Sequence, residues 1–156
     1  PELSRTIIVL IMFIGACAGS TGGGIKVSRI IILFKSMAKE LSVMIHPKQV
    51  RKITVDSHAI DHETVRSVNV YMVCYIMVFV ISMGVMSFDN YDLITNFTAV
   101  AATLNNVGPG LEMVGPIQNF GFMSSPAKLI LIFDMLAGRL ELFPMLLLFA
   151  PATWKK

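Results

Sequence analysis

Residues 105–110, Asn-Asn-Val-Gly-Pro-Gly, form a glycine-rich turn whose backbone carbonyl oxygens could coordinate a dehydrated cation. A ring of carbonyls can replace the water shell of an ion, and glycine permits the extended or left-handed backbone that presents them. The turn follows residues 91–104, an apolar helix-compatible run that is too short to cross a bilayer. This pattern is typical of a pore helix and filter strand. An extracellular loop is the alternative, and the apolar helix favours the re-entrant interpretation.

A second chemical feature is the small-residue stretch at 15–24, which ends in Ser-Thr-Gly-Gly-Gly. Each glycine costs a helix about 1 kcal/mol relative to alanine, so the helix should break here. The break falls inside an apolar block, where unpaired backbone must face water or protein. The stretch therefore predicts a hinge or pore-facing loop. A helix-packing motif is the alternative, and the spacing does not match a phosphate-binding loop.

Arg139 is the third feature, because it lies near the centre of an apolar block. A central arginine costs a membrane helix about 2.5–3.5 kcal/mol, so it normally faces a bundle interior or a water-filled path. An ion pair with Asp134 or Glu141 is the alternative, but helices favour pairs three or four residues apart. We therefore expect the partner elsewhere, and the hydroxyls and freed carbonyls of residues 19–24 lie at similar depth.

These features lie within or between three apolar blocks, Thr6–Phe34, Val68–Phe88 and Ala127–Trp154. Only 15% of the residues are charged, the mean hydropathy is +0.70, and a soluble domain is about a quarter charged. Since about 20 apolar residues cross a bilayer, the sequence predicts an all-α integral membrane protein and not an enzyme. The missing initiator Met and signal peptide suggest a fragment that lacks its N-terminal part.

The charges predict the orientation of the blocks. Basic residues crowd positions 26–52 and the end of the chain, whereas residues 89–127 carry none. Under the positive-inside rule the connection at 37–66 and the C-terminus are cytoplasmic, and Trp154 is an interfacial anchor. A nucleic-acid site is the poorer explanation of the basic residues, because apolar spans flank them.

The cytoplasmic connection should contain local structure of its own. Pro47 should end the preceding helix, residues 50–60 could form a short hairpin, and Asp61 is a candidate N-cap for the next helix. His46, His58 and His62 are expected to be solvated, since no other ligand types lie at a metal-site spacing. Cys17 and Cys74 are expected to be buried thiols without a disulfide.

The predicted organisation has five parts. They are a broken transmembrane helix at 1–36 with an intramembrane loop at 18–24, a cytoplasmic connection at 37–66, a transmembrane helix at 67–88, a re-entrant pore helix and filter at 89–126, and a transmembrane helix at 127–156.

Three motifs in this order resemble the Trk/Ktr/HKT superfamily of potassium transporters, and most closely its TrkH type. They are GACAGSTGGGIKV at 15–27, LNNVGPG at 104–110 and GRLELFP at 138–144. The resemblance covers essentially the whole chain. It implies helix–pore-loop–helix repeats around a central pore, of which this chain would hold the last helix of the third repeat and the whole fourth repeat.

The resemblance also implies roles for residues. The gate loop would be Ala18, Gly19, Ser20, Thr21, Gly22, Gly23 and Gly24; the filter would be Asn106, Val107, Gly108 and Pro109, with potassium on the carbonyls of Asn106, Val107 and Gly108; and Arg139 would hold the gate. The implied partners are the upstream repeats, membrane lipid, a second copy in a homodimer and a cytoplasmic nucleotide-binding regulatory subunit. No cofactor is implied, and potassium is the transported ion.

Potassium uptake across the inner (plasma) membrane is therefore the function that the sequence predicts. The filter lacks the Thr-Val-Gly-Tyr-Gly form of potassium channels, which leaves the discrimination against sodium open. The main alternative is a secondary transporter with discontinuous helices for another cation such as sodium, which would not need a pore helix at 91–110. A non-conducting scaffold is a third alternative, and it leaves Arg139 and the three glycines unexplained.

Overall fold

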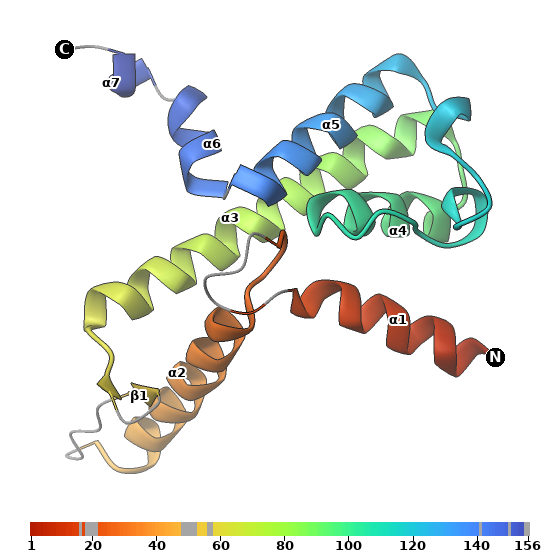
Figure 1. The fold of residues 1–156 in the computed structure, drawn as a ribbon. Helices are drawn as coiled ribbons and strands as arrows, with labels where there is room; N and C mark the ends of the chain where they lie inside the picture. Colours follow the sequence, from red (N-terminus) through yellow and green to blue (C-terminus); the bar gives the residue numbers. More distant parts are fainter. Residues whose placement is uncertain are drawn as a thin grey trace.

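The computed structural model describes residues 1–15, 17, 22–47, 53–55, 58–140, 142–149 and 151–154. These residues are mainly helical (Figure 1). In chain order the elements, with η for short 3-10 helices, are α1 (Glu2–Ile14), α2 (Val27–Ile45), β1 (Thr54–Val55), β2 (His58–Ala59), α3 (His62–Met86), η1 (Ser87–Asp89), α4 (Leu93–Leu104), η2 (Glu112–Val114), η3 (Phe120–Phe122), α5 (Ser125–Leu140), α6 (Leu142–Phe149) and α7 (Pro151–Trp154).

Helix α3 is the longest element and organises the others. Within the described ranges, His62–Asp89 is the one helical segment whose length and apolarity suffice to cross a membrane. Asp61 precedes α3 as its N-cap residue, without a capping hydrogen bond from its side chain. Large apolar side chains remain exposed on the face of α3 opposite its buried residues, among them Val73, Ile76 and Val80. An apolar helix of this kind suits a lipid or protein environment and not water.

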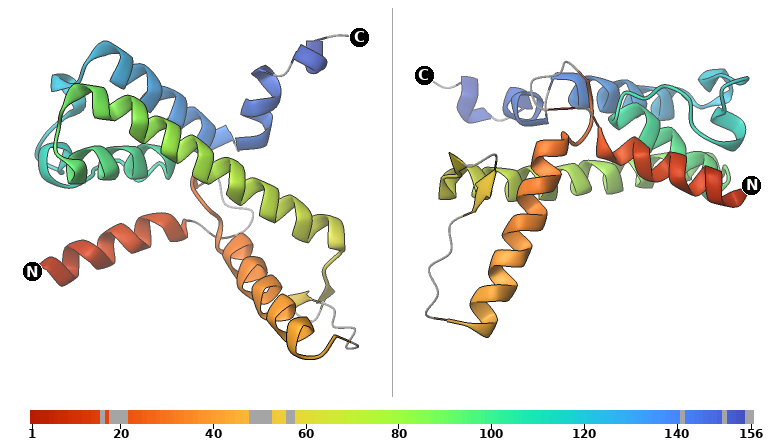
Figure 2. Two further views of the ribbon diagram at one scale, coloured as in Figure 1. Left: turned by 180° about the vertical axis from the view of Figure 1, so that it is seen from behind. Right: turned by 60° about the horizontal axis from the view of Figure 1, so that its bottom comes forward.

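Helices α3, α4 and α5 pack together, and α1 lies against α4 (Figure 1). Helix α2 leaves this group at a steep angle, as the second view in Figure 2 shows. It packs against the first half of α3. Strands β1 and β2 pair antiparallel beside it, with Thr54 opposite Ala59, and Lys35 Nζ donates to the Thr54 carbonyl at 2.6 Å. The group of α1, α3, α4 and α5 is therefore the part that holds residues 105–110.

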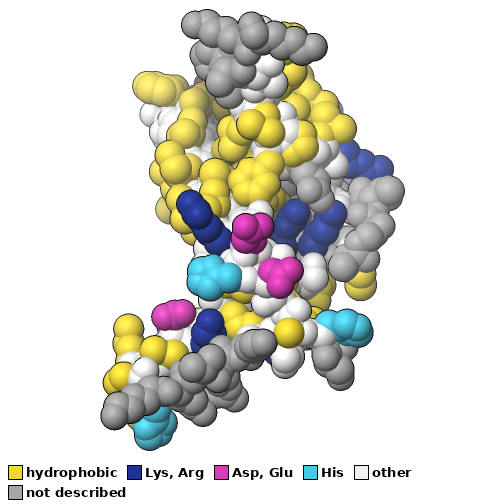
Figure 3. Space-filling view, turned by 90° about the vertical axis from the view of Figure 1, so that its left-hand side faces the viewer, with side chains coloured by type: hydrophobic (Ala, Val, Ile, Leu, Met, Phe, Trp, Pro, Cys, Tyr) yellow, Lys and Arg dark blue, Asp and Glu magenta, His cyan; other side chains and the backbone are white. Residues whose placement is uncertain are grey.

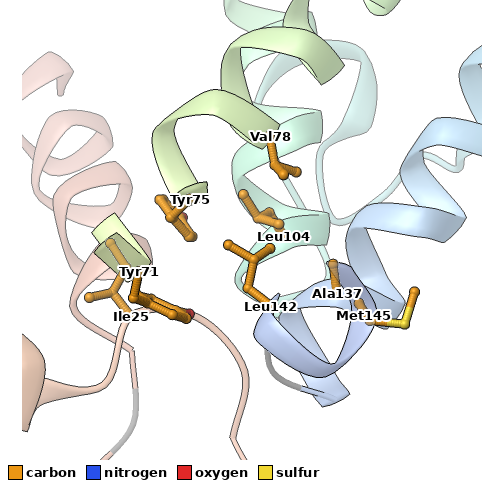
Figure 4. Close-up of a cluster of buried hydrophobic side chains, with 8 residues drawn as sticks. All are labelled: Ile25, Tyr71, Tyr75, Val78, Leu104, Ala137, Leu142 and Met145. Carbon is orange, nitrogen blue, oxygen red and sulfur yellow. The ribbon is translucent and has the colours of Figure 1, made fainter. Parts of the chain in front are cut away.

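Two apolar clusters hold this arrangement together. One joins the middle of α4, the end of α3 and the first half of α5, and includes Met86, Val100 and Leu131. The other joins α3, the end of α4 and the α5–α6 junction (Figure 4), and consists of Ile25, Tyr71, Tyr75, Val78, Leu104, Ala137, Leu142 and Met145. Because Leu104 is fully buried in it, the C-terminus of α4 has a fixed position.

The described residues of the predicted transmembrane helix at 127–156 belong to α5, α6 and α7. Helix α6 runs at an angle to α5 (Figure 1). The reason is Pro144, which lacks a backbone N–H and whose ring would clash with the carbonyl four residues earlier, at Leu140. Helix α5 ends at Leu140, and Pro144 lies in the first turn of α6, where proline is tolerated.

Charged and histidine side chains gather on one face of the molecule (Figure 3). Figure 3 shows them around the lower half of the molecule, below a region covered by hydrophobic side chains. A cavity of about 600 Å³ lies in this part, between α2, the β strands and the start of α3; its charged lining residues are Lys39, Glu40, Asp61 and Arg66, and His62 also lines it. This cavity is therefore lined by charges of both signs.

Candidate functional site

Helix α4 supports the site and is the most completely buried helix of the described chain. Its N-terminus is capped by Asp92, whose carboxylate accepts a hydrogen bond from the Ile94 amide at 3.0 Å. From Thr98 to Leu104 every residue is buried. The Thr103 hydroxyl donates a hydrogen bond to the Ala99 carbonyl at 2.8 Å, so this buried polar group has a partner within the helix. The helix is therefore a buried and well-packed support for the residues that follow it.

The end of α4 turns the chain sharply into the predicted filter. Asn105 is the C-cap, and Asn106 has a left-handed φ of 54°. The Asn106 amide donates to Thr103 and the Val107 amide to Ala102, at 3.0 and 2.9 Å. This pair of bonds is the Schellman arrangement, with asparagine in the position that glycine usually fills. Asn106 therefore fixes the direction in which the following strand leaves the helix.

The strand from Asn106 to Pro109 is anchored at both ends and open between them. Beyond it, the Gly110 amide donates to Val114 at 2.8 Å, and Leu111 donates to the Thr98 hydroxyl at 3.0 Å. Gly108 has a φ of +110°, and no atom lies within 4 Å of the position of a Cβ there. Among the described residues, no hydrogen bond occupies the carbonyl oxygens of residues 106–108. These oxygens are available to a ligand.

The described end of the small-residue stretch lies against this strand. Ala18, Gly19, Ser20 and Thr21 fall outside the described residues. Gly15 and Gly24 have φ values of +67° and +80°, and a Cβ on Gly15 would overlap the Ile25 carbonyl oxygen. The chain therefore leaves α1 and returns to nearly the same point. The sequence-predicted helix break thus lies between α1 and α2.

Two glycines of this stretch contact the two asparagines at the end of α4. A Cβ on Gly23 would lie 2.7 Å from Asn106 Nδ2, and one on Gly24 would lie 2.6 Å from Asn105 Oδ1. Beside these contacts, a cavity of about 370 Å³ separates α1 from the strand, and its lining includes Gly22 and Val107. The structure thus brings residues 22–24 and 105–107 together, although 80 residues separate them.

Helix α5 closes the other side of the strand. Asn106 Nδ2 donates to the Met135 carbonyl at 3.1 Å. A Cβ on Gly138 would overlap the Leu104 carbonyl oxygen, so only glycine allows this approach of α5 to the end of α4. A cavity of about 500 Å³ lies farther along the same face, between α5 and residues 106–108.

Arg139 follows Gly138, and its side chain is exposed. Asp134 is not its partner: the Asp134 carboxylate is fully buried and accepts from the Ser82 hydroxyl at 2.8 Å. Glu141, the other candidate, lies outside the described residues. Among the residues that the structure describes, Arg139 has no ion pair or hydrogen bond. Its predicted contact with residues 19–24 therefore stays a prediction.

Sequence reasoning missed Tyr75, Gly138 and Ser82 as parts of this site, and it placed Asn105 in the glycine-rich turn without a role for its side chain. The Tyr75 hydroxyl donates to Asn105 Oδ1 at 2.9 Å, in a buried contact. A signal for some of these residues was present, since Ser82 and Asp134 are isolated polar residues within apolar blocks, and buried polar groups need partners. Nothing in the sequence indicated which partner each would have.

The family model for TrkH, described as a cation transport protein, matches residues 2–156 of this chain. The Trk system potassium uptake protein TrkH of Salmonella typhimurium is 43% identical over 156 residues, which cover 100% of this chain and 32% of that protein. The Trk system potassium uptake protein TrkG of Escherichia coli is 34% identical over 154 residues, 97% of this chain and 31% of that protein. The chain thus spans about a third of the length of these relatives.

A solved structure shows that the fold of the chain is also similar to that of a potassium transporter. The crystal structure of the potassium transporter TrkH from Vibrio parahaemolyticus matches with a TM-score of 0.88 and 41% sequence identity. The match covers 99% of this chain and 33% of that one.

Proposed function

The chain belongs to the TrkH family of cation transport proteins, and from this premise we propose that it forms part of the pore of a potassium uptake protein. It supplies the last helix of the third repeat and the whole fourth repeat. Upstream repeats of the same polypeptide supply the other filter strands. Its relatives are named potassium uptake proteins, and they are about three times as long.

The observation that carries the proposal is the strand from Asn106 to Pro109. It is anchored at both ends, it is open in the middle, and the carbonyl oxygens of residues 106–108 have no partner in the described chain. Exposed backbone carbonyls on a fixed support can replace the water shell of a potassium ion. Four such strands around one axis would form the filter.

The intramembrane loop at residues 18–24 is the gate of this pore. In support, its described end, Gly22–Gly24, lies directly against the base of the filter strand. Arg139 stabilises the closed gate by donating hydrogen bonds to the loop, and its positive charge repels cations. The exposed position of Arg139, one residue beyond the contact of Gly138 with Leu104, is compatible with both roles.

The protein is a multi-pass protein of the inner (plasma) membrane. Exposed large apolar side chains on α1, α3 and α5, such as Leu10, Ile76 and Leu129, provide the lipid-facing surface. Residues 37–66 and the C-terminus lie in the cytoplasm, following the basic residues. A homodimer with a cytoplasmic nucleotide-binding regulatory subunit is the working assembly, as the resemblance implies.

A secondary transporter for sodium accounts for the broken helix but not for the anchored strand after α4. A non-conducting scaffold accounts for neither the broken helix nor the anchored strand. The test is ion flux through the full-length protein, reconstituted into proteoliposomes with potassium or sodium as the only permeant cation. Potassium flux above that of empty liposomes, and greater than sodium flux, is expected. Deletion of residues 18–24 should raise the flux; a flux that falls with the amount of folded protein would make the loop structural.

A further inference from the structure

We propose that Asn105 and Tyr75 form a positioning pair that couples the gate loop to the filter and so helps to set ion selectivity. The inference rests on the proposed function. Neither side chain belongs to the predicted filter or gate, and neither is placed to touch the ion. Their role follows from three contacts that meet at one amide group.

The Asn105 side chain is held from both ends. Its Nδ2 donates to the Ala101 carbonyl at 2.8 Å, and its Oδ1 accepts from the Tyr75 hydroxyl at 2.9 Å. Asn105 and Tyr75 are each 4% exposed, so water does not compete for either bond. The amide is therefore fixed in one orientation between α4 and α3.

The gate loop rests on the same amide. A Cβ on Gly24 would lie 2.6 Å from Asn105 Oδ1, so the loop backbone and the Tyr75 hydroxyl meet at one oxygen atom. Gly24 has a φ of +80°, a conformation that glycine adopts readily. Any movement of Gly24 toward α4 must displace the Asn105 side chain.

Such a displacement reaches the filter through one peptide bond. Asn105 precedes Asn106, whose left-handed φ of 54° sets the direction of the strand. Asn106 itself contacts Gly23 and donates to the Met135 carbonyl. Two consecutive glycines of the loop thus contact two consecutive asparagines at the filter base. Removing the Tyr75 hydroxyl leaves the Asn105 amide held only through its bond to Ala101. The less constrained side chain should loosen the filter without any change in a filter residue.

A purely structural hydrogen bond would give a different result. Its loss would lower the amount of folded protein but leave the discrimination between ions unchanged. Tyr75→Phe distinguishes the two, because it removes one oxygen and keeps the buried ring. Tyr91→Phe is the matched control: its hydroxyl donates to the Phe122 carbonyl, also at 2.9 Å, in the loops beyond the opposite end of α4.

The experiment compares the two variants in the full-length protein, with potassium and sodium flux measured in proteoliposomes. Tyr75→Phe should purify like Tyr91→Phe and show a potassium-to-sodium flux ratio about two- to tenfold below wild type, the factor expected for one hydrogen bond. Tyr91→Phe should keep the wild-type ratio. A wild-type ratio for Tyr75→Phe overturns the proposal, and so does a failure of this variant to fold.

A double-mutant cycle tests the coupling to the gate. Gly24→Ala and Asn105→Ala should each change the potassium-to-sodium ratio, and together they should change it by less than the product of the single effects, because the truncated side chain no longer opposes the added methyl group. Independent, multiplicative effects would refute the coupling. If the wild-type protein conducts no potassium, the result refutes the proposed function itself and not only the coupling.

Discussion

Gly138→Ala is the substitution for which the structure gives the clearest magnitude. The new Cβ would overlap the Leu104 carbonyl oxygen and would lie 2.7 Å from Asn106 Nδ2. Since Cβ contacts below 3.0 Å essentially do not occur, the backbone must move. Overpacking of this kind costs about 1–3 kcal/mol. The Leu104 carbonyl lies two residues before the filter, so the displacement falls on Asn106 and Val107.

We expect Gly138→Ala to lower potassium flux per reconstituted protein about tenfold, the factor that about 1.4 kcal/mol in a barrier produces. The assay is flux in proteoliposomes together with thermal unfolding of the purified protein. Gly84→Ala is the matched control, because no atom lies within 4 Å of its Cβ position on α3. Alanine should stabilise that helix by up to about 1 kcal/mol. If Gly138→Ala behaved like Gly84→Ala, the close contact between α5 and α4 would not position the filter.

Three further predictions concern single residues. Gly108→Ser should lower the potassium-to-sodium flux ratio at normal yield, because a φ of +110° strains an L-residue while the surrounding space is open; an unchanged ratio would remove Gly108 from the filter. Arg139→Ala should raise flux at normal yield, with Arg139→Lys between it and wild type because lysine keeps the charge but loses the planar fork of donors; wild-type flux in both would defeat the gate role. Asp134→Asn should preserve thermal stability, whereas Asp134→Ala should lose about 1–3 kcal/mol by leaving the buried Ser82 hydroxyl unpaired; equal unfolding temperatures would contradict this.

The family and the order of the elements could be predicted from the sequence, because both depend on local patterns. The apolar run at 91–104 and the turn after it correspond to α4 and the open strand. The three glycines interrupt the helix, as their propensity requires. The bend near Pro144 could also have been predicted from local rules, but the length of the apolar block favoured a single helix.

The contacts within the site could not be predicted, because they depend on distances between segments far apart in the chain. In the sequence the pair Asn105-Asn106 is typical of a turn. Only the structure shows that the Asn105 side chain contacts α3 and the Asn106 side chain contacts α5. Gly138 looked like an ordinary small residue beside a notable arginine. Its importance is visible only in the distance to Leu104.

The end of α4 has an electrostatic consequence for any ion that lies beside it. Aligned peptide dipoles place about half a negative elementary charge at the C-terminus of a helix. Helix α4 has no basic residue in its last turn, and it ends directly at the strand whose carbonyls are open. A cation beside Asn106 and Val107 therefore meets a favourable potential that acts beyond direct coordination, and an anion meets an unfavourable one. Rejection of anions at this position follows from the direction of the helix and would persist in any filter variant that leaves α4 in place.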